Sequence, residues 1–175
     1  LVWGRDQNPH YNSRWTYDVT VKGNYAYCAD SYGLRIYDVS TPASTESVGI
    51  LEKSGGRTTW SICLYGSSTI ILGQDAGTID MMDVSNPADP SYAADYIDVT
   101  SDIYSVIVDG DTLFAADYTD GLVSLDLSGD AFGFGKKMQT DSARGSCVTI
   151  DQGGSNLYFC GTTGFLSYTL SACVP

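Results

Sequence analysis

The chain is poor in basic residues, and it has a single histidine, His10. Its nine Lys and Arg are outnumbered by 21 Asp and Glu, which gives a formal net charge of −12 at pH 7. Such a surface repels phosphate backbones and anionic lipid headgroups, so we expect no nucleic-acid partner. No apolar run approaches the roughly 20 residues of a membrane-spanning helix. We therefore expect no membrane insertion.

Motifs for catalysis and metal binding are also missing from the sequence. There is no Gly-x-Ser-x-Gly elbow and no P-loop, and a Ser/His/Asp arrangement would have to recruit His10 from an irregular stretch. The five cysteines form neither a Cys-x-x-Cys motif nor a Cys/His zinc pattern. We therefore expect a protein that is not an enzyme and that holds no cofactor or metal. Calcium has only weak support, and a hydrolase is an alternative that no motif favours.

What the chain does have is a segment of about 44 residues that recurs four times. Turn glycines mark the recurrence at positions 33, 77, 121 and 164, so that successive glycines are 44, 44 and 43 residues apart. Each period contains short runs rich in Val, Ile, Tyr and Phe, bounded by Gly, Asn, Asp and Pro. That composition is typical of strands and turns, and no stretch shows sustained helical spacing. A fixed period of alternating strands predicts an all-β propeller with four-stranded antiparallel blades.

In the first repeat the strand-like runs are 17–21, 25–29, 34–38 and 47–51. The fourth repeat lacks a fourth strand, whereas residues 1–6 have no repeat of their own and resemble residues 47–52. We therefore predict a single domain in which the N-terminal strand completes the last blade and closes a four-bladed ring. The rival arrangement is four blades of a larger ring that another chain completes. The expected blades are about 17–51, 59–97, 104–139, and 146–170 with 1–6.

The residue pattern of the repeats resembles that of a known family. The phrase from Ala26 to Pro42, AYCADSYGLRIYDVSTP, is similar to the LVIVD repeat, and the segments 79–87 and 114–122 match the same phrase. The fourth repeat departs most, since Thr169 replaces the blade aspartate. The resemblance implies a β-propeller of secreted or cell-surface proteins of bacteria and archaea. It implies no catalytic residues, because the matched positions are those that build the blade.

The cysteines suggest two pairings. Cys147 and Cys160 lie equally far from the centre of a turn at Gly153 and Gly154, so in a regular hairpin they face each other and could form a disulfide. The alternative is two small buried thiols. A second pairing, Cys28 with Cys63, would have to cross between neighbouring blades. Cys173 is then left over as a free thiol or an intermolecular partner.

Aspartates and tyrosines gather at the expected turns. Asp109, Asp111, Asp117 and Asp120 flank glycines, and turn chemistry explains them better than an acid pair or a calcium site does. Asp38, Asp83 and Asp126 end the third strand of their repeats, where we expect them to bond backbone amides. The turn between the second and third strands adds aromatic residues, and these turns share one face of a propeller. The candidate binding rim consists of Asp30, Tyr32, Asp75, Asp117, Tyr118 and Asp120.

Two functional classes follow from these features. The first is a non-enzymatic extracellular or cell-surface module that associates with itself into a larger assembly or filament, favoured by the 13 tyrosines and the unpaired Cys173. The second is a lectin-like module that binds a glycan or another ligand on the rim or in the central channel. Asp18, Ser61, Ser105 and Cys147 occupy equivalent channel positions, and they make a poor calcium cage. The expected partners are copies of the chain, a surface glycan or another protein.

Overall fold

The computed structural model describes residues 15–52, 56–97, 101–128, 137–139, 144–151, 154–162 and 164–170. Within these residues the regular secondary structure consists of β-strands, and the strands form antiparallel sheets that follow the four repeats. The expectation of an all-β fold is therefore confirmed. No helix in these residues has the length and apolarity needed to cross a membrane.

Sheets 1 and 2 each contain four strands in sequence order. Sheet 1 consists of β1 (Thr16–Lys22), β2 (Tyr25–Asp30), β3 (Gly33–Asp38) and β4 (Glu46–Glu52). Sheet 2 consists of β5 (Thr59–Tyr65), β6 (Thr69–Gln74), β7 (Thr78–Asp83) and β8 (Ser91–Ile97). The strands expected in the first repeat thus match the observed ones to within one residue at each end.

Sheets 3 and 4 repeat the same order. Sheet 3 consists of β9 (Ile103–Asp109), β10 (Thr112–Asp117), β11 (Gly121–Asp126) and the short β12 (Lys137–Gln139). Sheet 4 consists of β13 (Gly145–Ile150), β14 (Asn156–Gly161) and β15 (Gly164–Thr169). The turn glycines that define the repeat, Gly33, Gly77, Gly121 and Gly164, all have positive φ. That conformation explains why glycine recurs at this turn.

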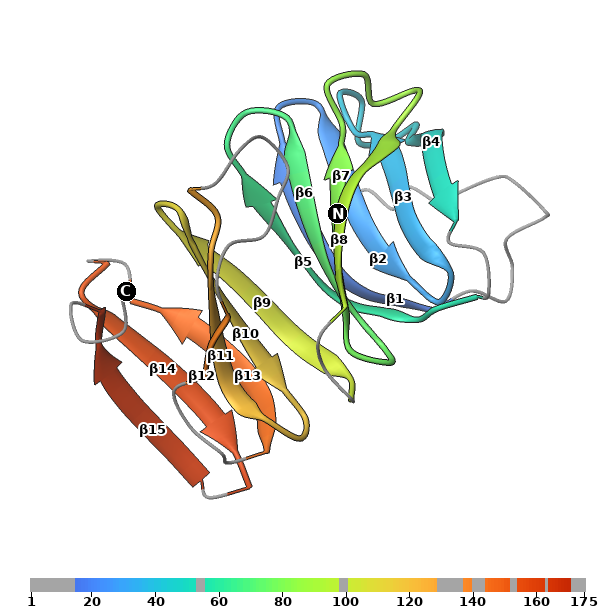
Figure 1. The fold of residues 1–175 in the computed structure, drawn as a ribbon. Coiled ribbons are helices and arrows are strands. Elements are labelled where there is room, and N and C mark those ends of the chain that lie inside the picture. The colour runs from blue at the N-terminus through green and yellow to red at the C-terminus, as the bar shows by residue number, and fades with distance from the viewer. Residues whose placement is uncertain are drawn as a thin grey trace.

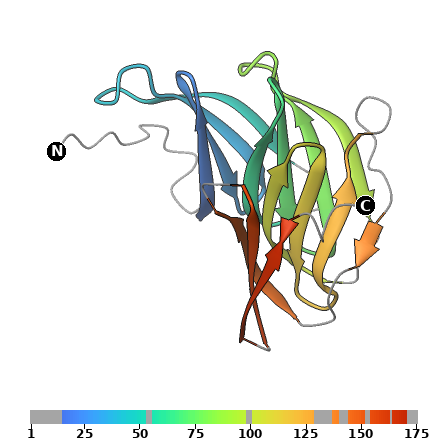
Figure 2. The ribbon, with the colours of Figure 1, turned by 90° about the vertical axis from the view of Figure 1, so that its left-hand side faces the viewer.

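The four sheets stand in a row, from sheet 4 at lower left to sheet 1 at upper right (Figure 1). The view from the side shows sheet 4 in front of the others (Figure 2). The inner strands β1, β5, β9 and β13 neighbour one another in that order. Among the described strands no contact of comparable extent joins β13 to β1. The described strands therefore form an open arc and not a closed ring.

Closure by the N-terminal strand, as predicted from residues 1–6, lies outside the described residues. A fourth strand of sheet 4 would pair with the outer edge of β15, because the strand order of the other sheets places it there. Such a strand would complete sheet 4.

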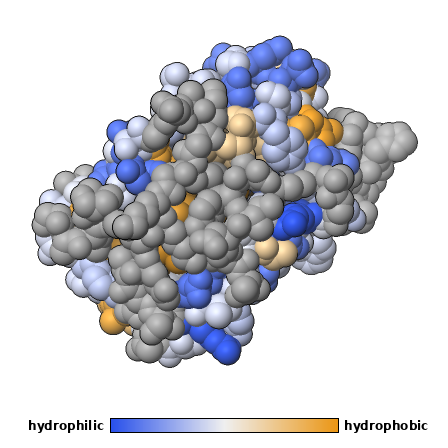
Figure 3. All heavy atoms as spheres, in the orientation of Figure 1, coloured by the Kyte–Doolittle hydropathy of each residue, from blue (hydrophilic) through white to orange (hydrophobic). Residues whose placement is uncertain are grey.

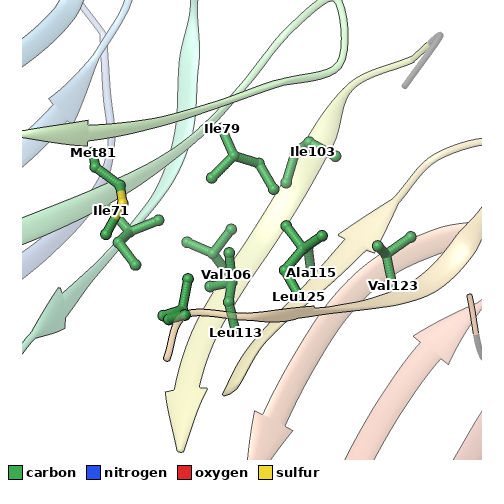
Figure 4. Close-up of a cluster of buried hydrophobic side chains, with 10 residues drawn as sticks. Ile71, Ile79, Met81, Ile103, Val106, Leu113, Ala115, Val123 and Leu125 are labelled. Atoms are coloured by element: carbon green, nitrogen blue, oxygen red, sulfur yellow. The ribbon is translucent and has the colours of Figure 1, made fainter. Parts of the chain in front are cut away.

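Buried apolar side chains fill the spaces between neighbouring sheets. Tyr27, Ala29 and Leu34 of sheet 1 pack against Ile62 and its neighbours in sheet 2. The cluster between sheets 2 and 3 is drawn in Figure 4, where side chains of β6 and β7 face those of β9 to β11. Phe114 and Phe159 belong to the cluster between sheets 3 and 4. Each joint between sheets is thus a separate small core, and burial of apolar area stabilises each one.

Candidate functional site

The back face of sheet 1, the face turned away from sheet 2, carries an exposed apolar stripe. Alternate residues of a strand point to one side of a sheet, and on β1 Val19 and Val21 lie on this face and are exposed. Trp15 and Tyr17, beside the bulge at the start of β1, are exposed as well. Where residues are coloured in Figure 3, hydrophobic side chains form small patches among hydrophilic ones. Exposed apolar residues that lie side by side in this way often mark an interaction surface.

Comparison between repeats shows what covers this face elsewhere. Val19 pairs with Cys28 in the register, and the residues at the same place in the next sheets are Ile62, Val106 and Val148. Those three are 6%, 5% and 5% exposed, whereas Val19 is 55% exposed. Each of the three packs against the preceding sheet, and sheet 1 has no preceding sheet in the described chain. The back face of sheet 1 is therefore a joint surface without its partner.

The front face of sheet 4 is open in the same way. Tyr158 occupies the place of Tyr27 and Phe114, both buried. Phe165 occupies the place of Leu34, which is 1% exposed, yet Phe165 is 65% exposed. The Tyr158 and Phe165 rings stack on each other at 5.6 Å. The arc therefore ends in two different joint surfaces, one at each end.

Hydrogen bonds between inner strands repeat from joint to joint. The Ile62 N–H donates to Asp18 Oδ2 at 3.0 Å, and the Val106 N–H donates to Ser61 Oγ at 3.1 Å. At the third joint the Ser105 hydroxyl donates to the Val148 carbonyl at 3.3 Å. The predicted equivalence of Asp18, Ser61, Ser105 and Cys147 is thus confirmed for the first three, whose side chains join one sheet to the next.

The fourth position of this series makes no such bond to the next inner strand among the described residues. Cys147 is exposed, and no such bond joins it to β1 in the described residues. The Val19 N–H, which would be its partner by analogy with Ile62 and Val106, donates instead to Asp18 Oδ1 at 2.8 Å. The two ends of the arc thus carry matching halves of the same contact.

A row of aromatic rings follows the inner strands. Near the start of each inner strand one residue lies outside the pairing register, a β-bulge that re-aims its side chain. These residues are Tyr17, Trp60, Tyr104 and Ser146. Tyr17 and Trp60 lie 4.7 Å apart between ring centroids, Trp60 and Tyr104 5.5 Å, and Tyr104 and Tyr118 5.8 Å. The row was not predicted from the sequence, although the equivalent spacing of Tyr17, Trp60 and Tyr104 in the repeat was a signal for it.

One member of the predicted rim, Tyr118, belongs to this row. It is exposed, and the Arg144 guanidinium lies 5.0 Å from its ring centroid and donates to its hydroxyl at 3.1 Å. Tyr32 is also exposed, and its ring lies beside Gly56. These contacts give the surroundings of each tyrosine, and the binding rim stays a prediction.

Asp30 and Asp117 of the predicted rim bond amides of their own turns, whereas Asp75 bonds an earlier segment. Asp30 accepts from the Tyr32 N–H at 2.7 Å and forms an ion pair with Arg35 at 3.2 Å. Asp117 is buried and accepts from the Thr119 and Asp120 amides. Asp75 accepts from the Thr58 N–H at 3.1 Å. The contacts of Asp30 and Asp117 agree with the turn interpretation, and Asp117 Oδ2 is buried without a hydrogen-bond partner.

The aspartates at the end of the third strand act as expected. Asp38, Asp83 and Asp126 each accept from the backbone amide of a serine two residues later at 2.8 Å. The Ser40 hydroxyl and then the Ser40 amide hold the pKa of Asp38 below its usual value. For Asp83 the Ser85 amide has the larger effect on the pKa. Within the described residues no group of three or more His, Cys, Asp or Glu side chains is placed to hold a metal ion.

Cys147 and Cys160 are direct partners in the pairing of β13 with β14, which confirms the register predicted from the turn. Both are free thiols here. Burial, followed by the hydrogen bond with Cys160, raises the pKa of Cys147. The disulfide stays a prediction: in an oxidising compartment we expect a bond worth about 3 kcal/mol or less. An unreduced digest of natively isolated protein checks it by mass spectrometry, and two free thiols would contradict it.

The alternative pairing of Cys28 with Cys63 is not supported. Tyr27 and Ala29 face sheet 2, so Cys28 between them faces away from it. Cys63 packs toward sheet 3, and burial raises its pKa to about 12. Both thiols are free, and they lie on faces turned away from each other. Cys173 lies outside the described residues.

Comparisons with known proteins agree with the repeat. The LVIVD repeat model matches residues 13–52 and 56–98, so the chain is an LVIVD-repeat protein. Its fold is similar to the crystal structure of the computationally designed Ika4 protein, with a TM-score of 0.68, 8% identity, and coverage of 97% of this chain and 99% of that one. It is also similar to a chain in the crystal structure of the mitotic checkpoint complex, with a TM-score of 0.67, 12% identity, and coverage of 86% and 45%. The comparison with curated proteins gave no match. At these identities the structural likeness shows a propeller-like fold alone.

Proposed function

We propose that this chain is a non-enzymatic interaction module, extracellular or on the cell surface, that associates with copies of itself through the two ends of its arc of sheets. One observation carries the proposal: Val19 is 55% exposed, whereas Ile62, Val106 and Val148 at the same place are at most 6% exposed. An apolar surface that is buried at three joints and open at the fourth is built for a partner of the same shape. The acidic composition and the LVIVD repeats support the extracellular location.

A four-bladed ring closed by residues 1–6 is the alternative form of this module. It would need sheet 4 to lie against β1, so that Val19, Val21 and Phe165 became buried within one chain. Deleting residues 1–6 separates the two forms. The closed ring predicts unfolding or aggregation of the truncated chain, whereas association between copies predicts that the truncated chain still folds.

Association is tested by light scattering on the full chain over a range of concentrations. Val19→Lys should weaken association at least about tenfold, because the joint loses a buried valine and must bury an ammonium group. Lysine is chosen because it makes the net charge less negative and so reduces the repulsion between copies. A loss of association therefore cannot be explained by stronger repulsion. The matched control is Thr20→Lys, because Thr20 pairs with Tyr27 and lies on the other face of β1. A wild-type chain that stays single at all concentrations would contradict the proposal.

A lectin-like function is a second candidate, and the aromatic row favours it. Aromatic faces bind the apolar faces of sugar rings, and Tyr17 and Tyr118 are the exposed ends of the row. A glycan array checks this alternative. Binding that Tyr118→Ala abolishes would support it, and an array without hits would leave self-association as the function.

A further inference from the structure

Resting on the proposed self-association, we propose that two copies join head to tail twice: the front face of sheet 4 in each copy covers the β1 stripe of the other, and eight sheets close into one two-chain ring. The joint repeats the register of the three joints within the chain. Its occupant is thus a second copy, because the chain itself carries both halves of the contact.

The first argument is the equivalence of the surfaces. The front faces of sheets 1, 2 and 3 are each buried by the back face of the next sheet, in the three apolar clusters. Sheet 4 presents Tyr158 and Phe165 at the corresponding places, and sheet 1 presents Val19 and Val21. The new joint therefore continues an interface that the molecule already forms three times.

The second argument is the unused hydrogen-bond position. Cys147 stands where Asp18, Ser61 and Ser105 reach the next inner strand. In the second copy that strand is β1, and the amide at the corresponding place is that of Val19. A thiol is a weak acceptor. The Val19 N–H keeps its hydrogen bond to Asp18 Oδ1. Neither end of the arc therefore presents a strong polar group without a hydrogen-bond partner at this position.

A contact distance within the chain shows which residues face each other across a joint. A Cβ placed on Gly73 would lie 3.0 Å from Cγ1 of Val106 in the next sheet. Cγ1 of Val106 is bonded to its Cβ. The Cβ positions of residues 73 and 106 are therefore separated by at most that distance plus the length of one carbon–carbon bond. Cys160 is the residue of sheet 4 that corresponds to Gly73, and Val19 corresponds to Val106. Across the proposed joint, Cys160 of one copy thus faces Val19 of the other at a distance suited to a disulfide.

The number of copies follows from the number of sheets. The four described sheets form an open arc, so closure needs further sheets, and propellers are typically built from about four to eight. A second copy brings the total to eight. A head-to-tail contact that closes after two copies forms a ring and not a filament. The ring also removes both exposed apolar ends.

Cysteine crosslinking tests the joint. Val19→Cys is placed in a chain that also carries Cys28→Ala and Cys147→Ser, because Cys28 and Cys147 are the direct cross-strand partners of positions 19 and 160. Diamide oxidation of the assembled protein converts two thiols to a disulfide and takes up both hydrogens. We expect a product of two chains on a non-reducing gel and a 19–160 linked peptide in its digest. Thiol titration before oxidation and a circular dichroism melt confirm that the variant is folded.

The matched control is Thr20→Cys in the same background, since position 20 lies on the opposite face of β1, and we expect no linkage to Cys160 from it. A 19–160 link within a single chain would overturn the proposal in favour of a ring closed by one copy. A mass of two chains without the 19–160 link would overturn this register but leave self-association standing. A mass of one chain without any link would remove both.

Discussion

Replacing Val106 by lysine is expected to unfold the protein, whereas the same change at Val19 should leave the melting temperature nearly unchanged in dilute solution. Val106 lies in the core between sheets 2 and 3 (Figure 4), and an unpaired ammonium there costs several kcal/mol out of a total stability of about 5–15 kcal/mol. At Val19 the ammonium stays in water.

Circular dichroism melts of the two variants measure the contrast. The concentration is kept below that of association, because binding between copies stabilises the folded state by mass action. Equal destabilisation by the two changes would show that Val19 is buried within one chain. That outcome would contradict the open arc.

Phe114→Ala should lower the free energy of unfolding by about 3–5 kcal/mol, because it removes a fully buried ring from the core between sheets 3 and 4. Tyr158→Ala at the corresponding place in sheet 4 should cost only about 1 kcal/mol. Its ring stacks on Phe165, and such a pair contributes roughly 0.5–1.5 kcal/mol.

Urea denaturation measures the free energy of unfolding of both variants. This comparison tests whether the front face of sheet 4 is open, just as the lysine variants of Val106 and Val19 test the back face of sheet 1. A Tyr158→Ala variant as unstable as Phe114→Ala would mean that a further sheet already covers Tyr158 within the single chain. Together the two comparisons locate the open ends without reference to any ligand.

Much of the fold could be predicted from the sequence because each repeat carries its own local signals. A positive-φ glycine stands at the first residue of each third strand or directly before it, and alternation of apolar residues sets the face of each strand. The same locality explains the success with Asp38 and its equivalents, whose partners are two residues away. The Cys147 and Cys160 register followed from one hairpin turn.

Closure could not be predicted in this way. Val19 and Val106 are the same residue in the same register position, and only the presence of a neighbouring sheet makes one buried and the other exposed. Whether sheet 4 meets sheet 1 depends on the rotation accumulated over three joints, which no local pattern encodes. The possible pairing of Cys28 with Cys63 could not be decided for a related reason, since spacing in the repeat says nothing about which sheet each face meets.

The candidate site was predicted only in part. The turn aspartates were identified, but their bonds to backbone amides use the carboxylates that a binding rim would need. The aromatic row was missed because bulges set the direction of Tyr17, Trp60 and Tyr104, and a bulge is visible only in the pairing register.

Native mass spectrometry of the full chain tests the central claim most directly. The account predicts a species of two chains, twice the 18.8 kDa of one, with no ladder of higher multiples, and its conversion to single chains by Val19→Lys. A single chain at every concentration, with the wild type and Val19→Lys indistinguishable, would contradict it.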